Sequence, residues 1–530
     1  MSQSALVTHG IPSPGAIGRI AIGDIVRRAA RRYPDRIALI EGDARLTFVE
    51  LDTAINRFAN FLLGSGLAKG DRVASLCANS WQFVVVMFAI HKAGLIWVPI
   101  NTGLAPDDVR FILDHSESRF AIVDDTLYAD PALRQPFDEL VRRVVLIPIA
   151  NHEVKDPTIG FADTLVGRSE TEPDVNIDDR DVAQIMYTSG TTGRPKGVMQ
   201  SHLAVYIASL GNVIEMEARH DDVASALMPL FHCAQHTFLC GFLHVGATSV
   251  IMRGFDAGKL IATIAKERLS WVFALPLMYS AILDHPARST GDLTSLRFCL
   301  YAMAPMAETL LRRLIGEICP NFALASGQTE MYPATVFFKP EQQLRRFGGY
   351  WGESSIINDT AIMNDEGRLL PRGEIGEIVH RGPNVLAGYY KNPEATAEVR
   401  KFGWHHTGDL GMFDADGQLL FTDRKKDMIK TGGENVPSVK VESVLLRHAA
   451  VANAVVIGLP HPRWIEAVTA FVIPKAAIAV TEEELIQHCK EHLGGFEVPK
   501  AVRFVESLPM TSTGKIQKHP LRQQYRGLYD

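Results

Sequence analysis

Short apolar segments alternate with helical patterns through the middle of this chain. Strand-like runs occur at 182–188, 247–252, 271–274 and 298–301, and they are separated by helical stretches such as 257–268 and 306–318. Strands that alternate with helices favour βαβ units, in which parallel strands are buried on both faces. The pattern therefore predicts an α/β fold in which sheets and helices form layers.

The pattern changes towards the C-terminus, and the change predicts separate domains. An earlier block has a helix at 48–63 and a strand at 72–77, whereas glycines punctuate a β-like segment at 373–390 that predicts a small barrel-like subdomain. Beyond 426, helices at 439–448 and 482–493 flank strands at 451–457 and 468–473. Since 530 residues exceed one ordinary core, we expect a large N-terminal domain, 1–425, and a small α+β C-terminal domain, 426–530.

The composition is that of a water-soluble globular protein, with 47% hydrophobic and 22% charged residues. A net charge of −6 comes without the concentrated basic face of a nucleic-acid-binding protein, and the apolar run at 83–90 is too short to span a bilayer. No basic-then-apolar signal begins the chain, and the six cysteines form no Cys-x-x-Cys pair. We therefore expect a cytoplasmic protein with reduced thiols, no nucleic-acid partner and no transmembrane segment.

One glycine-rich segment follows the strand predicted at 182–188. It reads Thr188-Ser189-Gly190-Thr191-Thr192-Gly193-Arg194-Pro195-Lys196-Gly197. Glycines let backbone amides turn towards an anion, the hydroxyls add donors, and the lysine supplies positive charge. The segment differs from the Walker A loop, because glycine follows the lysine. It predicts a polyphosphate-binding loop, and a surface turn rich in glycine and threonine is the alternative.

The segment resembles the phosphate-binding signature of the adenylate-forming superfamily, which contains acyl-CoA synthetases, peptide-synthetase adenylation domains and luciferases. Further segments resemble that family's motifs in the same order. The second nucleotide motif corresponds to Ser-Gly-Gln-Thr-Glu at 326–330, the ribose motif to Trp-His-His-Thr-Gly-Asp-Leu at 404–410, and the hinge to Asp-Arg-Lys-Lys-Asp at 423–427. Gly-Gly-Glu-Asn follows at 432–435, and Pro-Met-Thr-Ser-Thr-Gly-Lys-Ile at 509–516 resembles the segment that bears the catalytic lysine. The resemblance covers about 46–522.

The resemblance implies a carboxylic acid–CoA ligase that uses ATP, Mg²⁺ and coenzyme A. A carboxylate attacks the α-phosphorus of ATP and expels pyrophosphate, and a thiol then attacks the acyl-adenylate and expels AMP. Since the first step concentrates negative charge on phosphorus, positioning and electrostatic stabilisation are expected to dominate.

The family's roles pass to matching residues of this chain. The loop residues would hold the β- and γ-phosphates of ATP; these are Thr188, Ser189, Gly190, Thr191, Thr192, Gly193 and Lys196. Gln328 belongs to the second nucleotide motif, Thr329 would donate to the α-phosphate, and Glu330 would help to hold Mg²⁺. Asp409 and Arg424 would bind the ribose hydroxyls, with a plain surface ion pair as the alternative. Lys515 would bridge the carboxylate and the α-phosphate, whereas Lys518 is expected to be a solvated loop lysine.

Lys515 and the phosphate loop fall in different predicted domains, so catalysis requires the small domain to close over the large one. The family rotates this domain between its half-reactions, which implies that Lys426 is the hinge residue. It also implies that the face formed by Gly432 and Gly433 replaces Lys515 and lines the CoA tunnel. Lys440 occupies a position where the family often has an acidic residue. This difference concerns the details of the surface on the CoA side and leaves the expected class of reaction unchanged.

The acyl pocket is expected to have largely apolar walls at 228–242, 301–306 and 326–332. These walls favour a fatty, alicyclic or aryl acid over an amino acid. His232 would gate the pocket or orient the carboxylate, with a structural histidine as the alternative. The cluster of His232, Cys233, His236 and Cys240 also resembles a zinc-ligand pattern, but the flanking phenylalanines favour a pocket helix. Ser326 stands where the family usually has an aromatic ring that stacks on adenine.

We therefore interpret the chain as a stand-alone AMP-forming acid–CoA ligase. An acyl-AMP ligase that loads a carrier protein is an alternative, as is a nucleotide-binding relative without turnover. A luciferase-like oxygenase has no sequence feature in its favour. The sequence leaves open whether the protein forms a homodimer.

Overall fold

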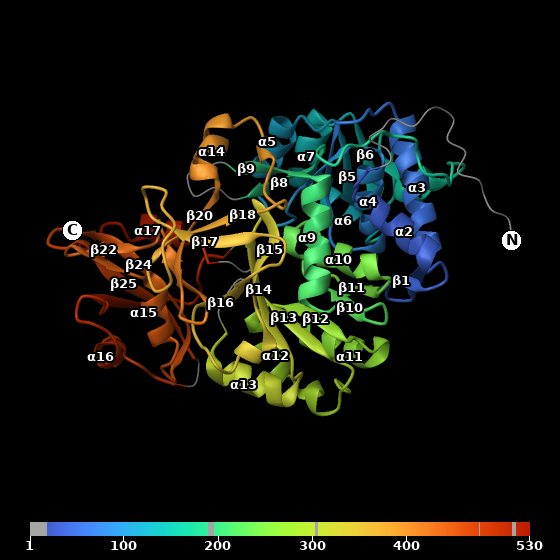
Figure 1. Ribbon diagram of the computed structural model, residues 1–530. Helices are drawn as coiled ribbons and strands as arrows, with labels where there is room; N and C mark the ends of the chain where they lie inside the picture. The colour runs from blue at the N-terminus through green and yellow to red at the C-terminus, as the bar shows by residue number, and fades with distance from the viewer. Residues whose placement is uncertain (1–17, 189–194, 303–305, 476–477, 511–515, 530) are drawn as a thin grey trace.

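The computed structural model describes residues 18–188, 195–302, 306–475, 478–510 and 516–529. In these residues the main body is built of two sheets with helices between and outside them (Figure 1). A smaller unit at the C-terminal end lies to one side of this body (Figure 1). This arrangement confirms the predicted α/β fold with layered sheets and a small C-terminal α+β part.

One sheet of the main body is mostly parallel and has eight strands among the described residues. Its strands follow the order β19 (Gly388–Tyr389), β9 (Lys196–Ser201), β8 (Val182–Thr188), β4 (Ile96–Pro99), β3 (Arg72–Leu76), β5 (Phe120–Asp124), β6 (Arg143–Ile147) and β7 (Ile159–Gly160). The pairs of β8 with β9 and of β9 with β19 are antiparallel. The glycine-rich segment therefore connects two neighbouring strands at one edge of this sheet.

The other sheet has thirteen strands in the described part of the chain. Their order is β17 (Asp359–Met363), β18 (Gly376–Arg381), β20 (His405–Phe413), β21 (Leu419–Arg424), β16 (Tyr350–Ser354), β15 (Met331–Phe338), β14 (Phe322–Gln328), β13 (Phe298–Tyr301), β12 (Trp271–Ala274), β10 (Val223–Ala226), β11 (Thr248–Ile251), β1 (Ile37–Glu41) and β2 (Ala44–Thr47). The strands from β10 to β14 run parallel, whereas those from β14 to β17 run antiparallel. In the segment predicted to form a barrel-like subdomain, 373–390, β18 thus continues the large sheet in an open strand order, whereas β19 belongs to the eight-stranded sheet.

Apolar side chains fill the space between the two sheets. The helices of this middle layer are α2 (Asp24–Arg32), α3 (Phe48–Gly64), α4 (Trp81–Lys92), α9 (His202–Glu215) and α10 (Cys233–Val245). All of them share one buried core with strands of both sheets, for example with Trp97 on β4 and Tyr332 on β15. Since α4 is apolar on every side from Phe83 to Ile90, it is buried along its whole length apart from Trp81.

Outer helices cover the remaining faces. The outer face of the eight-stranded sheet carries α5 (Pro106–Ser116) and α7 (Pro131–Leu140), and the large sheet carries α11 (Ala257–Glu267), α12 (Pro276–Asp284) and α13 (Glu308–Glu317). Three short helices complete the main body: α6 (Asp125–Tyr128), α8 (Phe161–Leu165) and α14 (Pro393–Glu398). None of the helices in the described ranges is both long and apolar enough to cross a membrane.

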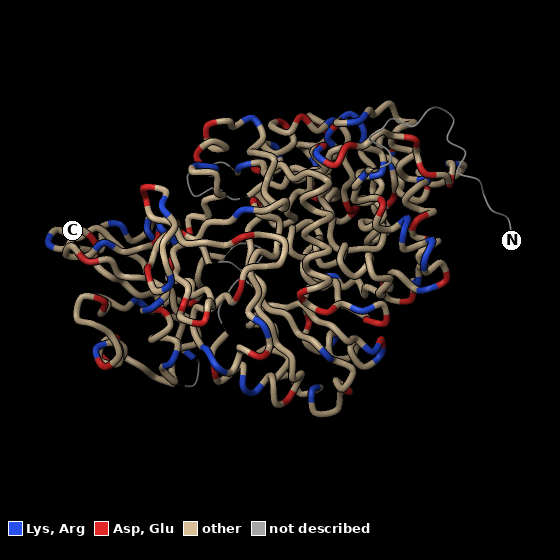
Figure 2. Tube along the Cα trace, viewed as in Figure 1, with Lys and Arg blue, Asp and Glu red and all other residues tan. Residues whose placement is uncertain are grey.

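The C-terminal unit forms a separate sheet with its own core. Its strands are β22 (Ile429–Thr431), β23 (Glu434–Val436), β24 (Val451–His461), β25 (Ile465–Pro474) and β26 (Ala501–Phe504). Its helices are α15 (Ser438–Leu445), α16 (Glu482–His492) and α17 (Lys518–Gln524). The helices and strands predicted beyond 426 lie within one or two residues of these bounds at most of their ends. Figure 2 shows that Lys and Arg alternate with Asp and Glu over the visible trace of both parts.

Candidate active site

The glycine-rich segment links the strands of the β8–β9 hairpin. The ladder of this hairpin reaches Thr188, which lies opposite Lys196. The predicted phosphate-binding residues between them lie outside the described residues; these are Ser189, Gly190, Thr191, Thr192 and Gly193. Lys196 Nζ lies 5.2 Å from the centre of the Tyr389 ring, a distance at which the ring face attracts an ammonium group. The predicted phosphate lysine is therefore held beside β19.

Tyr389 also contacts the predicted metal ligand. Thr329 and Glu330 form the turn between β14 and β15. The Tyr389 hydroxyl donates a hydrogen bond to Glu330 Oε1 at 3.1 Å. Burial, together with this carboxylate, raises the pKa of Tyr389 above its ordinary value, so the hydroxyl stays protonated at neutral pH. Tyr389 thus joins Lys196 of the first motif to Glu330 of the second.

The start of helix α10 lies against the same turn. Thr329 Oγ1 is 3.6 Å from Cys233 Sγ, and Gln200 Nε2 donates to the Thr329 carbonyl at 2.6 Å. His232 caps α10, since its Nδ1 accepts the backbone N–H of Ala234 at 3.3 Å. Burial raises the pKa of the Cys233 thiol to about 12, so this cysteine is a neutral thiol at pH 7. His232 therefore enters the site as the capping residue of α10.

The predicted ribose-binding residues face one another across two strands. Asp409 on β20 pairs with Arg424 on β21, and Arg424 Nε lies 3.4 Å from Asp409 Oδ1. Gln328 Nε2 donates to Asp409 Oδ2 and to the Thr407 carbonyl, each at 2.9 Å. His405 Nε2 donates to Gln328 Oε1 at 3.3 Å. The amide of Gln328 thus ties the predicted nucleotide motif to the predicted ribose motif.

The predicted hinge begins directly after this pair. The fully buried carboxylate of Asp423 accepts hydrogen bonds from both the backbone N–H and the hydroxyl of Ser438, at 2.5 and 2.8 Å. Lys425 Nζ lies 2.7 Å from Asp365 and 3.5 Å from Glu377. Burial lowers the pKa of Lys426 from its ordinary value. The segment therefore contacts both parts of the molecule, with Asp423 bound to the start of α15.

The predicted CoA-side glycines form the tip of a hairpin. Gly432 and Gly433 connect β22 to β23 and have φ angles of +59° and +89°, which glycine adopts without a steric penalty. The N–H of Gly432 donates to the Trp464 carbonyl at 2.9 Å, while a Cβ at Gly433 would meet no atom within 4 Å. The backbone conformation therefore explains why glycine occupies these two positions, and no other atom of the described part of the protein packs against the Cα of Gly433 where a side chain would begin.

The two C-terminal lysines differ from one another. Lys515 lies outside the described residues. The prediction that Lys518 is a solvated loop lysine is wrong, because Lys518 begins α17 and only 14% of its side chain is exposed. Its Nζ donates to Ser438 Oγ at 2.6 Å and lies 2.8 Å from Glu442 Oε1. The local residue pattern around Lys518 does not indicate these partners, since both lie on α15.

The predicted acyl wall packs on the large sheet. Phe238 and Phe242 of α10 are buried against Trp271, with ring centres 5.9 and 5.0 Å away. Trp271 in turn stacks on Phe298 at 5.5 Å. The same apolar cluster includes Met228 and Ala325. The wall segment at 228–242 thus meets strands β12 and β13, and β13 ends at Tyr301, where the predicted wall at 301–306 begins.

The zinc-like cluster has another explanation. His236 Nδ1 and the Tyr332 hydroxyl are 2.5 Å apart, and burial lowers the pKa of His236 to about 3. A grouping with metal-ligand geometry is found elsewhere in the described chain, at His488, Glu491 and His492. His236 and Cys240 therefore lie on the buried side of α10.

Sequence analysis missed Tyr389 and Gln200. Both lie in or beside β9, and both contact the turn that carries Thr329 and Glu330. Tyr389 lies in a glycine-punctuated β segment where a tyrosine is ordinary, so nothing in the local pattern pointed to a site residue. Only the pairing of β19 with β9 brings it to Lys196.

Comparison with known proteins identifies the family to which the chain belongs. Residues 26–390 match the model of the AMP-binding enzyme family, and residues 440–515 match that of the AMP-binding enzyme C-terminal domain. A feruloyl-CoA synthase from Amycolatopsis sp. is 34% identical over 94% of this chain and 98% of its own length. A long-chain-fatty-acid–CoA ligase from Mycobacterium tuberculosis is 35% identical over 95% of this chain and 98% of its own.

Solved structures show the same fold. The ATP-bound MatB structure from Rhodopseudomonas palustris superposes with a TM-score of 0.87 at 27% identity, and it covers 96% of this chain and all of its own. The Mycobacterium tuberculosis fatty acyl CoA synthetase has a TM-score of 0.76 at 32% identity, over 96% of this chain and 99% of its own. The chain therefore belongs to the AMP-binding enzyme family, within which it is an AMP-forming acid–CoA ligase.

Proposed function

We propose that this ligase activates an apolar carboxylic acid and binds MgATP along one connected line of side chains. The observation that carries the proposal is that line itself. Lys196 lies over Tyr389, and Tyr389 donates to Glu330. Two residues before Glu330, Gln328 donates to Asp409, which lies beside Arg424. Phosphate-binding and ribose-binding groups thus follow one another in the order of the parts of ATP.

The charges along this line suit the nucleotide. Lys196, with Thr188 and the loop 189–193, would hold the β- and γ-phosphates, and Thr329 would donate to the α-phosphate. Asp409 would accept hydrogen bonds from the ribose hydroxyls, to which Arg424 would donate. Because Lys196, Asp409 and Arg424 are already held by strands and by neighbouring side chains, little reorganisation of these groups is needed when charge develops on phosphorus.

Glu330 fits a role as Mg²⁺ ligand. Mg²⁺ prefers carboxylate and phosphate oxygens, and Glu330 presents a half-buried carboxylate that the Tyr389 hydroxyl orients. When bound, the ion would neutralise charge on the departing pyrophosphate. Tyr389 would keep the carboxylate aimed towards the phosphates.

The second half-reaction is proposed to depend on the C-terminal part. We place the domain boundary between 425 and 426, with Lys426 as the hinge residue. The sheet and core that begin at Ile429 support this boundary, because they are formed from residues of that part. Lys515 would bridge the acid and the α-phosphate during adenylation, and Gly432 with Gly433 would face the thiol of CoA afterwards.

The acid is proposed to be fatty, alicyclic or aryl. The aromatic cluster that Phe238 and Phe242 form with Trp271 supports an apolar acyl group, because both phenylalanines lie on α10, whose first residue, Cys233, contacts Thr329. His232 would orient the carboxylate at the start of α10. Relatives act on a similar range, since they include a feruloyl-CoA synthase, a long-chain-fatty-acid–CoA ligase and an alicyclic propanoyl:CoA ligase. We also propose a cytoplasmic location, supported by six buried free cysteines.

Pyrophosphate release tests the proposal. The purified protein is incubated with MgATP and a panel of short, medium, long-chain, alicyclic and aryl acids, each with and without CoA. Release that depends on an apolar acid and yields AMP and a thioester with CoA is the expected result. Release that CoA does not accelerate would instead favour a carrier protein as acyl acceptor. ATP binding without release for any acid would favour a relative that has lost turnover.

A further inference from the structure

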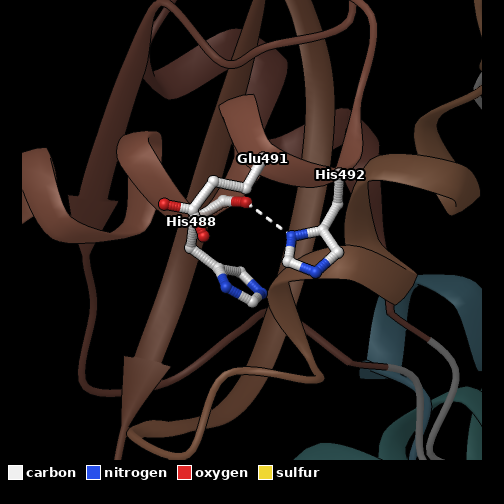
Figure 3. Close-up of side chains that lie close together, drawn as sticks. All are labelled: His488, Glu491 and His492. Carbon is white, nitrogen blue, oxygen red and sulfur yellow. Dashed lines mark hydrogen bonds between the residues drawn. The ribbon is translucent and has the colours of Figure 1, made fainter.

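A cluster of metal-ligating side chains lies at the end of helix α16, on the C-terminal part of the molecule and apart from the residues proposed to bind ATP. His488, Glu491 and His492 each offer one ligand atom, and these atoms lie within 4.8 Å of one another. Figure 3 shows the two imidazole rings side by side, with Glu491 from the same helical turn. Residues four apart on a helix lie on one face, so the helix itself brings the histidines together.

Hydrogen bonds set the tautomer of both histidines. His488 Nε2 lies 3.0 Å from the Val444 carbonyl, and His492 Nδ1 lies 2.9 Å from the His488 carbonyl, a contact drawn in Figure 3. A carbonyl only accepts, so these nitrogens carry the protons. The lone pairs then belong to His488 Nδ1 and His492 Nε2. Metal-binding histidines have this arrangement, in which the second ring nitrogen donates to a carbonyl or carboxylate.

The surroundings favour a cation at this position. The cluster occupies the last turn of α16, and the C-terminal end of a helix carries partial negative charge. Gln487 Nε2 donates to Glu491 Oε1 at 3.3 Å and so helps to hold the carboxylate. The helix is also well anchored, since a capping box of Thr481 and Glu484 begins it and Leu485 and Cys489 are buried beneath it.

A neighbouring histidine is not part of the ligand set. The ring of His448 packs edge-on against His488, with the centres 5.1 Å apart. Its Nδ1 accepts the backbone N–H of Ala450 at 3.3 Å, so the neutral ring carries its proton on Nε2. His448 therefore supports the His488 ring without offering a lone pair to a metal.

We propose that His488, Glu491 and His492 form a surface site for a divalent transition-metal ion such as Zn²⁺, Ni²⁺ or Co²⁺. Two imidazoles and one carboxylate suit these ions, whereas Mg²⁺ prefers oxygen ligands. Because Glu491 and His492 are exposed, water completes the coordination. The site is distinct from the proposed Mg²⁺ position at Glu330, and it ties together the final turn of α16.

The test uses the full chain without a polyhistidine tag. Zn²⁺ binding is measured by titration calorimetry, and Co²⁺ binding by its visible absorption, with Mg²⁺ present in excess. The wild-type chain is expected to bind one equivalent of Zn²⁺ or Co²⁺ that a His488→Gln/His492→Gln variant does not bind. His492→Gln alone is expected to weaken this equivalent by about tenfold or more, because even the loss of a group that merely orients a ligand costs about that much.

The matched control is His448→Phe, which keeps a ring against His488 and is expected to bind the metal as the wild type does. Far-UV circular dichroism and acid-dependent pyrophosphate release, neither of which depends on this site, show whether each variant is folded. Equal binding by the wild type and the double variant, or loss of binding in folded His448→Phe, would overturn the proposal. So would a wild-type chain in which Mg²⁺ displaces Co²⁺.

Discussion

At the scale of single residues, the site depends on Tyr389, which holds two charged groups with one side chain. Its ring contacts the Lys196 ammonium and its hydroxyl contacts the Glu330 carboxylate. A hydrogen bond to a charged group contributes about 1.5–3 kcal/mol. The loss of that bond alone therefore corresponds to a measurable change in rate.

Tyr389→Phe is expected to lower kcat/KM for MgATP about tenfold, because it removes the hydroxyl but keeps the ring beneath Lys196. Pyrophosphate release under varied MgATP measures this effect. Tyr390→Phe, at the next position, is the control and should retain wild-type kinetics. If the two variants behave alike, Tyr389 has no role in orienting Glu330.

Ser326 tests the adenine side of the site. Ser326 lies half-buried on β14, opposite Val336. At this position the adenylate-forming family usually has an aromatic ring. A stacked ring contributes about 1 kcal/mol. Ser326→Tyr is therefore expected to lower the KM for ATP, or to block an acid that needs the space, as measured by pyrophosphate release across the acid panel. No change in either quantity would rule out the idea.

At the scale of secondary-structure elements, the connection between β21 and β22 carries Lys426, which we propose as the hinge residue. The hydrogen bonds of this turn are donated by Asp427 and Met428 to the Arg424 carbonyl. Proline at 426 would leave those donors in place but would fix φ near −65°. The turn can then form, whereas a rotation about residue 426 is blocked.

Lys426→Pro is accordingly expected to keep acid-dependent pyrophosphate release and to lose most thioester formation. The two half-reactions are measured separately, as pyrophosphate release without CoA and as acyl-CoA formed from preformed acyl-adenylate. Lys426→Ala serves as the control, since alanine leaves φ free. An equal loss of both half-reactions in the proline variant would count against the hinge role.

Helix α15 is tied to strand β21 through Ser438. Its N–H and hydroxyl both donate to the buried Asp423, and the hydroxyl accepts from Lys518. Ser438→Ala is expected to lower the free energy of unfolding by about 1–3 kcal/mol, because a buried carboxylate loses a donor. Urea denaturation followed by tryptophan fluorescence measures the change. Ser443→Ala, on the same helix, removes only a bond to the Val439 carbonyl and should cost less; a reversed order would contradict this account.

At the scale of the whole molecule, buried histidines link stability to pH. Burial lowers the pKa of His202 to about 4, and it lowers the pKa of His236, His244, His380 and His405 to about 3, all from an ordinary value of 6.5. The unfolded chain therefore binds protons below pH 6.5 that the folded chain does not bind. These groups leave stability intact above pH 6.5, and they remove it as the pH falls towards 4.

The free energy of unfolding is expected to change little between pH 8 and 7 and to fall steeply between pH 6.5 and 4. Each histidine contributes a slope of up to about 1.4 kcal/mol per pH unit in that range. Urea midpoints at a series of pH values measure the fall. The exposed His220→Gln variant should follow the same curve. A flat profile down to pH 4.5 would show that these rings are protonated in the folded protein.

Much of the fold was predictable because hydrophobic spacing is a local property. Strands β8, β12 and β13 have the predicted bounds, and α3 and α11 differ from prediction by one residue at one end. The order of the motifs was equally local, since each motif is a short run of residue types. Glu330, Asp409 and Arg424 are candidates because these motifs resemble those of the adenylate-forming family, and the motifs alone do not show which residues of the chain they contact.

The contacts that join these motifs depended on the tertiary structure. Tyr389 meets Lys196 only because β19 pairs with β9, and Gln328 meets Asp409 only because β14 and β20 belong to the same sheet. Lys518 differed from prediction for the same reason, since its partners Ser438 and Glu442 lie on another helix. The chain thus specified its elements and its reactive groups through local residue patterns. Strand pairing and packing, which act between residues far apart in the sequence, decided which of those groups meet.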